Sequence, residues 1–273
     1  MFHRGGNRGM IGGPDIASVG SGTLVGFVLG LIGGGGSILA VPLLVYVVGV
    51  ASPHVAIGTS AVAVALSAFA NLLGHARAGN VRWPCALIFS AAGIAGAAAG
   101  STLGKSFDGQ KLMLLFGVLM IVIAVMMLVR KAGDGTAFRP LARETAPSLL
   151  PRLLGMGGLV GAMSGFFGIG GGFLIVPGLM GAARMPMILA IGSSLVAVTA
   201  FGITTAISYA LSGLVDWRIA ILFVAGGVAG GLGGTLLAKR LASHKSLLTR
   251  VFAAIVAIVG AYVVARGSAA VFG

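Results

Sequence analysis

Apolar stretches long enough to cross a lipid bilayer recur along the whole chain, and they constrain the fold more than any other feature. About 20 consecutive apolar residues span the hydrocarbon core as a helix. Charged residues make up 8% of the chain and hydrophobic residues 58%, whereas a soluble domain has roughly 25% charged residues. The sequence therefore predicts an all-α polytopic membrane protein. The apolar stretches are 15–50, 54–74, 83–104, 109–129, 153–183, 186–211, 217–238 and 246–265.

The chain contains two copies of one pattern. At an offset of 135, "GLIGGGGSILAVPLL" at 30–44 aligns with "GFFGIGGGFLIVPGL" at 165–179. At an offset of 134, "AIGTSAVAV" at 56–64 aligns with "AIGSSLVAV" at 190–198, and "GNVRW" at 79–83 aligns with "GLVDW" at 213–217. Biased composition would not align proline and tryptophan in the same order. The pattern predicts an N-terminal membrane repeat at 15–130, a basic linker loop at 131–150 and a C-terminal membrane repeat at 151–266.

Each repeat opens with an apolar stretch that glycines interrupt. The 36 residues of 15–50 would form a helix about 54 Å long, against a hydrocarbon core of roughly 30 Å. Glycine is a poor helix former, so we expect the chain to turn at 33–36 and at 168–172. Each repeat then begins with a glycine-broken helical hairpin, which gives about eight to ten membrane segments.

The hairpins decide how the two repeats are oriented. One span per glycine stretch gives parallel repeats, whereas a hairpin gives inverted repeats. The inverted arrangement gives the larger imbalance of Lys and Arg between the two sides, as the positive-inside rule favours. Inverted repeats are therefore the prediction, with both termini on the same side of the membrane.

The glycine turns are also the predicted substrate-binding site. Non-helical backbone at membrane depth occurs where protein or a water-filled cavity surrounds it, and in transporters the N-termini of broken helices point at anionic groups. We expect new helices to begin near Ser37 and near Gly172, with free N–H groups that attract an anion. Close helix packing is the alternative role for these glycines. The predicted binding residues in the turns are Gly33, Gly34, Gly35, Gly36, Ser37, Gly168, Gly170, Gly171 and Gly172.

Three other rows of glycines are spaced by four residues, and we assign them to packing. Small residues at this spacing form a helix face on which a second helix can lie closely. The rows are Gly22, Gly26 and Gly30; Gly157, Gly161 and Gly165; and Gly226, Gly230 and Gly234.

Polar side chains recur on one face of the helix expected at 54–74 and of its repeat mate. A polar stripe in a membrane helix faces the protein interior, where it either bonds neighbouring helices or lines the permeation path. Thr59, Ser60, Ser193 and Ser194 follow the glycine turns closely in both repeats, so they are the predicted substrate contacts. The remaining pathway candidates are Asn71, His75, Thr205 and Tyr209.

No lysine or arginine is expected in the middle of a span, so half-helix ends and hydroxyls would supply the positive potential for an anion. This predicts one site between the repeats near the midplane. Arg77 and Arg184 would steer anions at the mouths.

Other functional classes find little support. The net charge of +13 is compatible with nucleic-acid binding, but the basic residues cluster in short loops, as orientation in a membrane requires, so no nucleic-acid partner is expected. The single Cys85 permits no internal disulfide, and no carboxylate lies deep in a span. We expect no metal site, no cofactor and no enzymatic activity.

The paired glycine motifs with their "VP" sequels, the repeated hydropathy pattern and the length resemble the TauE/SafE family of sulfite and organosulfonate exporters over nearly the whole chain. The resemblance implies export of small anions such as sulfite, sulfoacetate or other organosulfonates across a bacterial inner membrane. An importer of thiosulfate or another small anion is one alternative, and a non-transporting membrane scaffold or assembly protein is another. Coupling to an ion, for example through protonation of His75, and a homodimer in place of a monomer both stay open.

Overall fold

The computed structural model describes residues 12–129, 146–168, 172–240 and 245–272, and these residues form helices and no strand. Eight of the helices are long and apolar enough to cross a membrane, and two shorter apolar helices occupy Gly35–Val48 and Leu174–Ala183. The prediction of an all-α polytopic protein with eight to ten membrane segments is confirmed. The first repeat contains α1 (Gly13–Ile32), η1 (Gly33–Leu39), α2 (Ala40–Leu43), η2 (Leu44–Val48), α3 (Pro53–Arg77), α4 (Trp83–Ser106) and α5 (Gly109–Val129). The second contains α6 (Ala146–Phe167), α7 (Gly172–Ala183), α8 (Met187–Ala210), α9 (Trp217–Arg240) and α10 (Lys245–Phe272).

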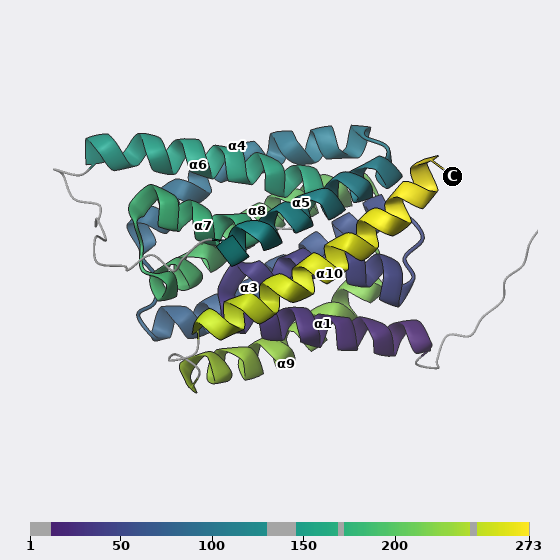
Figure 1. Ribbon diagram of the computed structural model, residues 1–273, viewed down its shortest axis with the longest axis horizontal. Coiled ribbons are helices and arrows are strands. Elements are labelled where there is room, and N and C mark those ends of the chain that lie inside the picture. Colours follow the sequence, from purple (N-terminus) through teal and green to yellow (C-terminus); the bar gives the residue numbers. More distant parts are fainter. Residues whose placement is uncertain (1–11, 130–145, 169–171, 241–244, 273) are drawn as a thin grey trace, which may run out of the picture.

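The closest helix pairs each join one helix of the first repeat to one of the second. α4 and α6 pack along one edge of the bundle, and α1 and α9 pack along the opposite edge (Figure 1). α3 and α8 pack against each other between these edges, while α5 and α10 form a further pair across the front of this view. The two sequence repeats therefore interleave and share one hydrophobic core.

The three rows of glycines lie in the edge pairs, and their assignment to packing is confirmed. A side chain at Gly26 would collide with the backbone of Gly227 in α9, and one at Gly161 would collide with the backbone of Gly93 in α4. The third row has the reciprocal contact, because a side chain at Gly230 would collide with the carbonyl of Thr23 in α1. Glycine is required here because backbone lies directly against backbone.

The central helices α3 and α8 run antiparallel. Gly58, near the start of α3, lies against the carbonyl of Leu214, just beyond the end of α8. Gly192, near the start of α8, lies against Asn80, just beyond the end of α3. The beginning of each central helix is therefore level with the end of the other.

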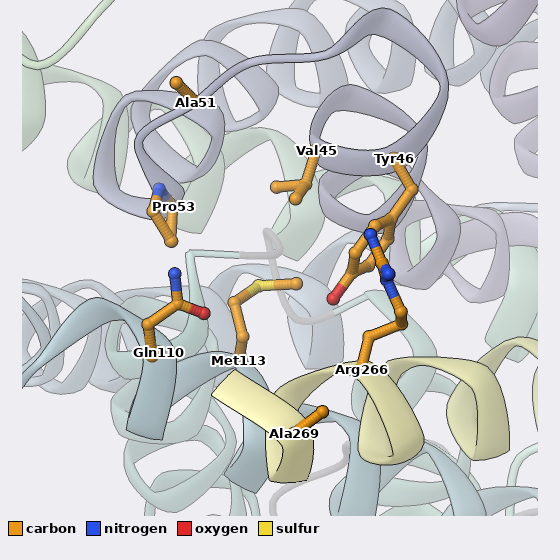
Figure 2. A pocket seen from close by; sticks show the side chains of 8 residues that line it. All are labelled: Val45, Tyr46, Ala51, Pro53, Gln110, Met113, Arg266 and Ala269. Carbon is orange, nitrogen blue, oxygen red and sulfur yellow. The ribbon is translucent and has the colours of Figure 1, made fainter. Parts of the chain in front are cut away.

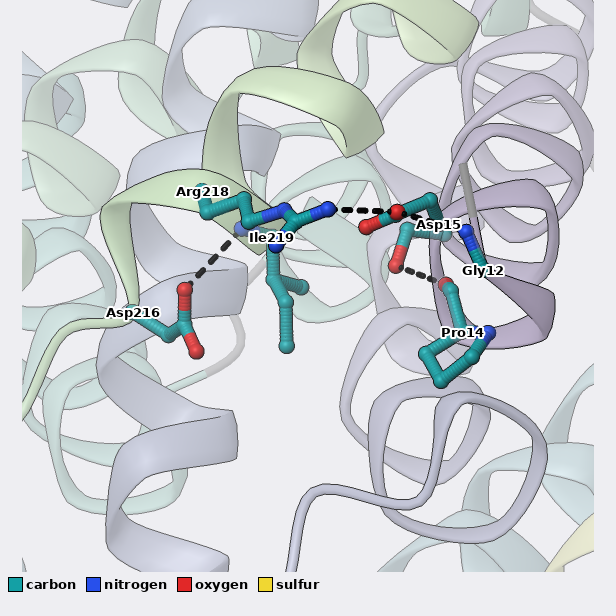
Figure 3. Close-up of polar contacts among 7 residues, drawn as sticks. Gly12, Pro14, Asp15, Asp216, Arg218 and Ile219 are labelled. Atoms are coloured by element: carbon teal, nitrogen blue, oxygen red, sulfur yellow. Dashed lines mark hydrogen bonds and ion pairs between the residues drawn. The ribbon is translucent and has the colours of Figure 1, made fainter. Parts of the chain in front are cut away.

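The acidic residues that the structure describes stand at helix starts. Asp15 Oδ2 accepts a hydrogen bond from the Gly12 N–H and pairs with Arg218 Nη2 of α9 at 2.7 Å (Figure 3). Asp216 accepts from the Ile219 N–H at 3.0 Å, and Asp108 accepts from the N–H groups at the start of α5. Carboxylates satisfy the free N–H groups of a first helical turn, so these three side chains have a structural role.

One expected boundary was wrong. α6 begins at Ala146, so the last residues assigned to the linker at 131–150 are helical. Pro147 stands at the start of this helix, where the missing N–H costs no hydrogen bond. Residues 130–145 lie outside the described part of the chain.

Candidate functional site

The first glycine turn reverses the chain at Gly33. This residue has a φ of 77° and a ψ of −147°, a conformation that is readily adopted only by glycine. A side chain here would also approach Ile191 of α8 to 2.8 Å. Gly36 then packs back against the backbone of Leu29 in α1, so the expected hairpin is present in this repeat.

The helix that follows this turn begins earlier than expected. A 3-10 helix starts directly at Gly33, and Ser37 is fully buried inside it. The expectation of a helix start near Ser37 is therefore wrong. The N–H groups of the first residues of a helix have no partner within it, and here these residues are glycines.

The second glycine turn has the corresponding features. α6 ends at Phe167, and Gly168 follows with a φ of 67° and its Cα directly against the side chain of Ile57 in α3. α7 begins at Gly172, as expected. Gly170 and Gly171 lie outside the described residues.

Hydroxyls at the start of α3, in the first repeat, bind this turn and the start of α9 in the second repeat. Ser60 Oγ donates to the carbonyl of Ile57 at 2.8 Å and lies 3.4 Å from the carbonyl of Gly168. Thr59 Oγ1 accepts a hydrogen bond from the Asp216 N–H at 2.9 Å. Thr59 and Ser60 are both fully buried. We call this group, with Gly168, the Thr59 cluster.

The start of α8 repeats these contacts with the first repeat. Ser193 Oγ accepts from the Arg82 N–H at 2.9 Å, and Ser194 Oγ donates to the carbonyl of Ile191 at 2.7 Å. At the offset of 134, Thr59 corresponds to Ser193, and Asp216 corresponds to Arg82. We call this group, with Gly33, the Ser193 cluster. Each cluster therefore ties one repeat to the other through a hydroxyl that accepts from a backbone N–H and through an isoleucine that packs on the glycine.

The two clusters are not brought together. Because α3 and α8 are antiparallel, the start of α3 and the start of α8 lie at opposite ends of the pair. About 20 helical residues separate the two levels, which is roughly 30 Å. The hydroxyls of the two clusters therefore lie apart, whereas η1 and α7, the short helices that follow the two glycine turns, pack against each other. One site between the repeats near the midplane stays a prediction.

The polar stripe on α3 faces the α1–α9 pair. A side chain at Gly231 or Gly30 would collide with the Asn71 amide, and one at Gly227 would collide with the Ser67 hydroxyl. Asn71 Nδ2 donates within its own helix, to the Ser67 carbonyl at 2.9 Å. His75 is buried on the same helix. The stripe is thus enclosed by glycine backbone in this conformation.

The matching positions on α8 contain buried hydroxyls that lack partners. Thr205 and Tyr209 are fully buried, and among the described residues their hydroxyls have no hydrogen-bond partner. Buried polar groups are usually hydrogen-bonded, so a polar partner is to be expected for these two in some state of the protein. Tyr209 lies beside Gly58, which directly precedes Thr59 in α3.

Comparison with known proteins identifies the family. The model of the sulfite exporter TauE/SafE family matches residues 18–263. The chain belongs to the TauE/SafE family. A probable membrane transporter of Xylella fastidiosa strain Temecula1 is 55% identical over 251 residues, which covers 92% of this chain and 95% of that protein. The probable membrane transporter YunE of Bacillus subtilis is 29% identical over 81% of this chain and 87% of its own length. No solved structure matches the chain.

In this TauE/SafE protein, the arginines expected at two mouths share one end of the bundle. Arg77 ends α3, and Arg184 lies just before α8; both are exposed. Since the end of α3 is level with the start of α8, both arginines lie at the end that holds the Ser193 cluster.

The sequence did not indicate the environment of Lys105, which lies near the end of α4. Its Nζ donates to the Ser208 carbonyl and to Ser212 Oγ, each at 3.0 Å. It also lies 5.9 Å from the centre of the Tyr209 ring. The only signal in the sequence was its alignment with Lys239 in the second TauE/SafE repeat. Lys105 neutralises the C-terminal end of α8, next to the Thr59 cluster.

Proposed function

We propose that this protein exports small sulfur-containing anions, such as sulfite, sulfoacetate or other organosulfonates, across a bacterial inner membrane. The observation that carries the proposal is the match to the sulfite-exporter family over residues 18–263. The names of the relatives support membrane transport, while the substrate and the direction are our inference. The repeated hydroxyl and glycine contacts support a site along the α3–α8 pair.

The substrate path follows the α3–α8 pair, with one cluster at each end. In this conformation Ile191 lies against Gly33 and Ile57 against Gly168, so a substrate can reach the backbone of these two glycines only after the isoleucine moves. We infer that the clusters open in alternation and that each supplies hydroxyls and glycine N–H groups to the anion. The unpartnered hydroxyls of Thr205 and Tyr209 support a polar path between them.

The proposal includes inverted repeats. Corresponding helices α3 and α8 lie antiparallel, and this favours an arrangement in which the second repeat enters the membrane from the opposite side. Cysteine labels near residues 78 and 212 in a Cys85-free variant should then react from opposite sides of the membrane. Labelling of both positions from the same side would contradict the inverted arrangement.

The proposed energetics need no coupling ion. With the cytoplasm negative, export of one anionic charge gains about 2.3 kcal/mol per 100 mV. The acidic residues that the structure describes cap helices and stand at their starts. Carboxylates of the kind that would carry Na⁺ or H⁺ through a span are thus absent from the described helix interiors.

Flux into and out of proteoliposomes tests the function. Protein reconstituted with radiolabelled sulfite or sulfoacetate should release the anion faster when the inside is made negative, and Ser194→Ala should slow this release. A matched control is Ser106→Ala, since Ser106 is exposed and its hydroxyl donates to Leu103 of its own helix. Uptake that exceeds release under physiological potential would favour an importer. No flux, together with no thermal stabilisation of the detergent-solubilised protein by these anions, would favour a scaffold.

A further inference from the structure

A pocket of about 370 Å³ lies where the start of α5, the end of α10 and the connection from η2 to α3 meet (Figure 2). Its volume is in the range of sites for small ligands. It stands at the end of the bundle where α3 begins, and therefore at the same end as the Thr59 cluster. The residues that line it are Val45, Tyr46, Ala51, Pro53, Gln110, Met113, Arg266 and Ala269.

Arg266 is the charged residue among these eight, and none of them is acidic. Within the described part of the chain, no carboxylate forms an ion pair with it, whereas Arg218 is paired with Asp15 at 2.7 Å. A guanidinium presents a planar fork of donors that matches two oxygens of a carboxylate or sulfonate. The pocket therefore has a cationic group without a counter-charge from the protein.

The acidic residue two positions before Gln110 is already engaged. Asp108 accepts hydrogen bonds from the Gln110 N–H at 3.1 Å and the Lys111 N–H at 3.0 Å, and so caps α5. Its carboxylate is thus held at the start of a helix that favours negative charge, and it does not neutralise Arg266.

Two neutral polar side chains accompany the arginine. The Tyr46 hydroxyl and the Gln110 amide are at the edge of the pocket (Figure 2), and Tyr46 is close enough to Arg266 to interact with it electrostatically. An edge-to-face contact with Tyr262, at 5.1 Å between ring centres, holds the Tyr46 ring. Both side chains can donate a hydrogen bond to an anion that Arg266 attracts.

The rest of the lining is apolar. Val45, Pro53, Ala269 and the buried Met113 form walls that offer no hydrogen bond. Such walls suit a ligand that carries a short hydrocarbon body behind its charged group. We propose that the pocket binds small organic oxyanions, with the carboxylate or sulfonate at Arg266 and the hydrocarbon part against Met113 and Val45. The choice of small organic oxyanions as the ligand rests on the proposed function, whereas the site itself rests on the residues that line the pocket.

Binding of propanesulfonate to the full chain in phosphatidylcholine nanodiscs, measured by calorimetry, tests the site. Arg266→Gln should weaken binding by about tenfold to hundredfold, because it removes a charge-assisted hydrogen bond. Ala269→Phe should weaken binding by filling the cavity while leaving the charge in place. Arg250→Gln is the matched control, since Arg250 is exposed on the same helix and does not line the pocket. Methanesulfonate should bind more weakly than propanesulfonate, by roughly threefold to fourfold for each missing CH₂.

Unchanged affinity in both Arg266→Gln and Ala269→Phe would overturn the proposal. A second arm uses nanodiscs that contain phosphatidylglycerol, because a lipid headgroup phosphate offers the same oxyanion chemistry. If propanesulfonate binds only in phosphatidylcholine, and phosphatidylglycerol copurifies with wild type but not with Arg266→Gln, the occupant is a lipid and the proposal fails. Arg266-dependent binding in a protein that shows no flux would support the proposed site and contradict the proposed transport function.

Discussion

The Thr59 cluster and the Ser193 cluster make the same contacts in different surroundings. In each, a hydroxyl accepts from a backbone N–H of the other repeat at 2.9 Å, and an isoleucine packs on a glycine with positive φ. The Thr59 cluster has Lys105, the buried Tyr209 and the Arg266 pocket at its end, whereas exposed Arg77 and Arg184 lie at the other end. Both repeats therefore contain the same structural core. The surroundings of the two clusters differ, so the two ends of the bundle can have different roles.

The largest expected effect comes from the turns themselves. Gly33→Val and Gly168→Val each place a β-branched residue at positive φ, which costs about 1–2 kcal/mol, and force a side chain into an isoleucine, which costs about 1–3 kcal/mol. We expect the thermal unfolding temperature in detergent to fall strongly and by similar amounts in both. Gly213→Val is the matched control, since Gly213 has a φ of 69° and open space around it. An effect of Gly168→Val no larger than that of Gly213→Val would show that packing against Ile57 is unimportant.

The next effect concerns the hydroxyls that join the repeats. Thr59→Val leaves the Asp216 N–H without its acceptor, and Ser193→Ala does the same to the Arg82 N–H. Each should cost about 1–3 kcal/mol of stability and speed hydrogen exchange at the start of the affected helix, α9 or α4. Thr204→Val should have little effect, because Thr204 donates within its own helix. If Thr59→Val and Ser193→Ala lowered the stability by strongly unequal amounts, the two clusters would not be equivalent.

A smaller effect is expected from Lys105→Met, which acts at one end only. It removes a cation from the C-terminal end of α8 and should destabilise the protein by about 0.3–1 kcal/mol. Lys111→Met is the control, because it removes a lysine at the same end of the bundle. Equal unfolding temperatures for the two variants would mean that the contacts of Lys105 with Ser208 and Ser212 contribute nothing.

The smallest effect should come from Arg77→Ala and Arg184→Ala. Both arginines are exposed, so they can raise the local anion concentration but are screened by salt. We expect initial flux to fall by less than about threefold, at low salt and low substrate, and only for substrate supplied from their side of the membrane. A loss of flux that persists at high salt would indicate that these arginines bind the substrate directly.

The membrane class, the hairpin at Gly33 and the packing role of the glycine rows were predictable, because each depends on local spacing and helix length. The contacts of Thr59 and Ser193 with the opposite repeat were not, since a sequence does not state which helices become neighbours. The same limit applies to the hydroxyls: Thr59 and Ser193 lie together or apart depending on whether α3 and α8 run parallel or antiparallel. Arg266 gave no motif at all, because the residues that line the pocket come from three separate segments.

The pairing of α1 with α9 has a consequence for how the protein is made. α1 leaves the ribosome long before α9, the helix whose backbone fits its glycine row. Contacts between residues so distant in sequence form late, and until then the glycine row of α1 faces lipid or a transient neighbour. α6 has its partner α4 already made when it emerges, so assembly proceeds from the middle of the chain outward. A chain whose synthesis stops in the linker would therefore contain α1 without α9, the helix against which it packs.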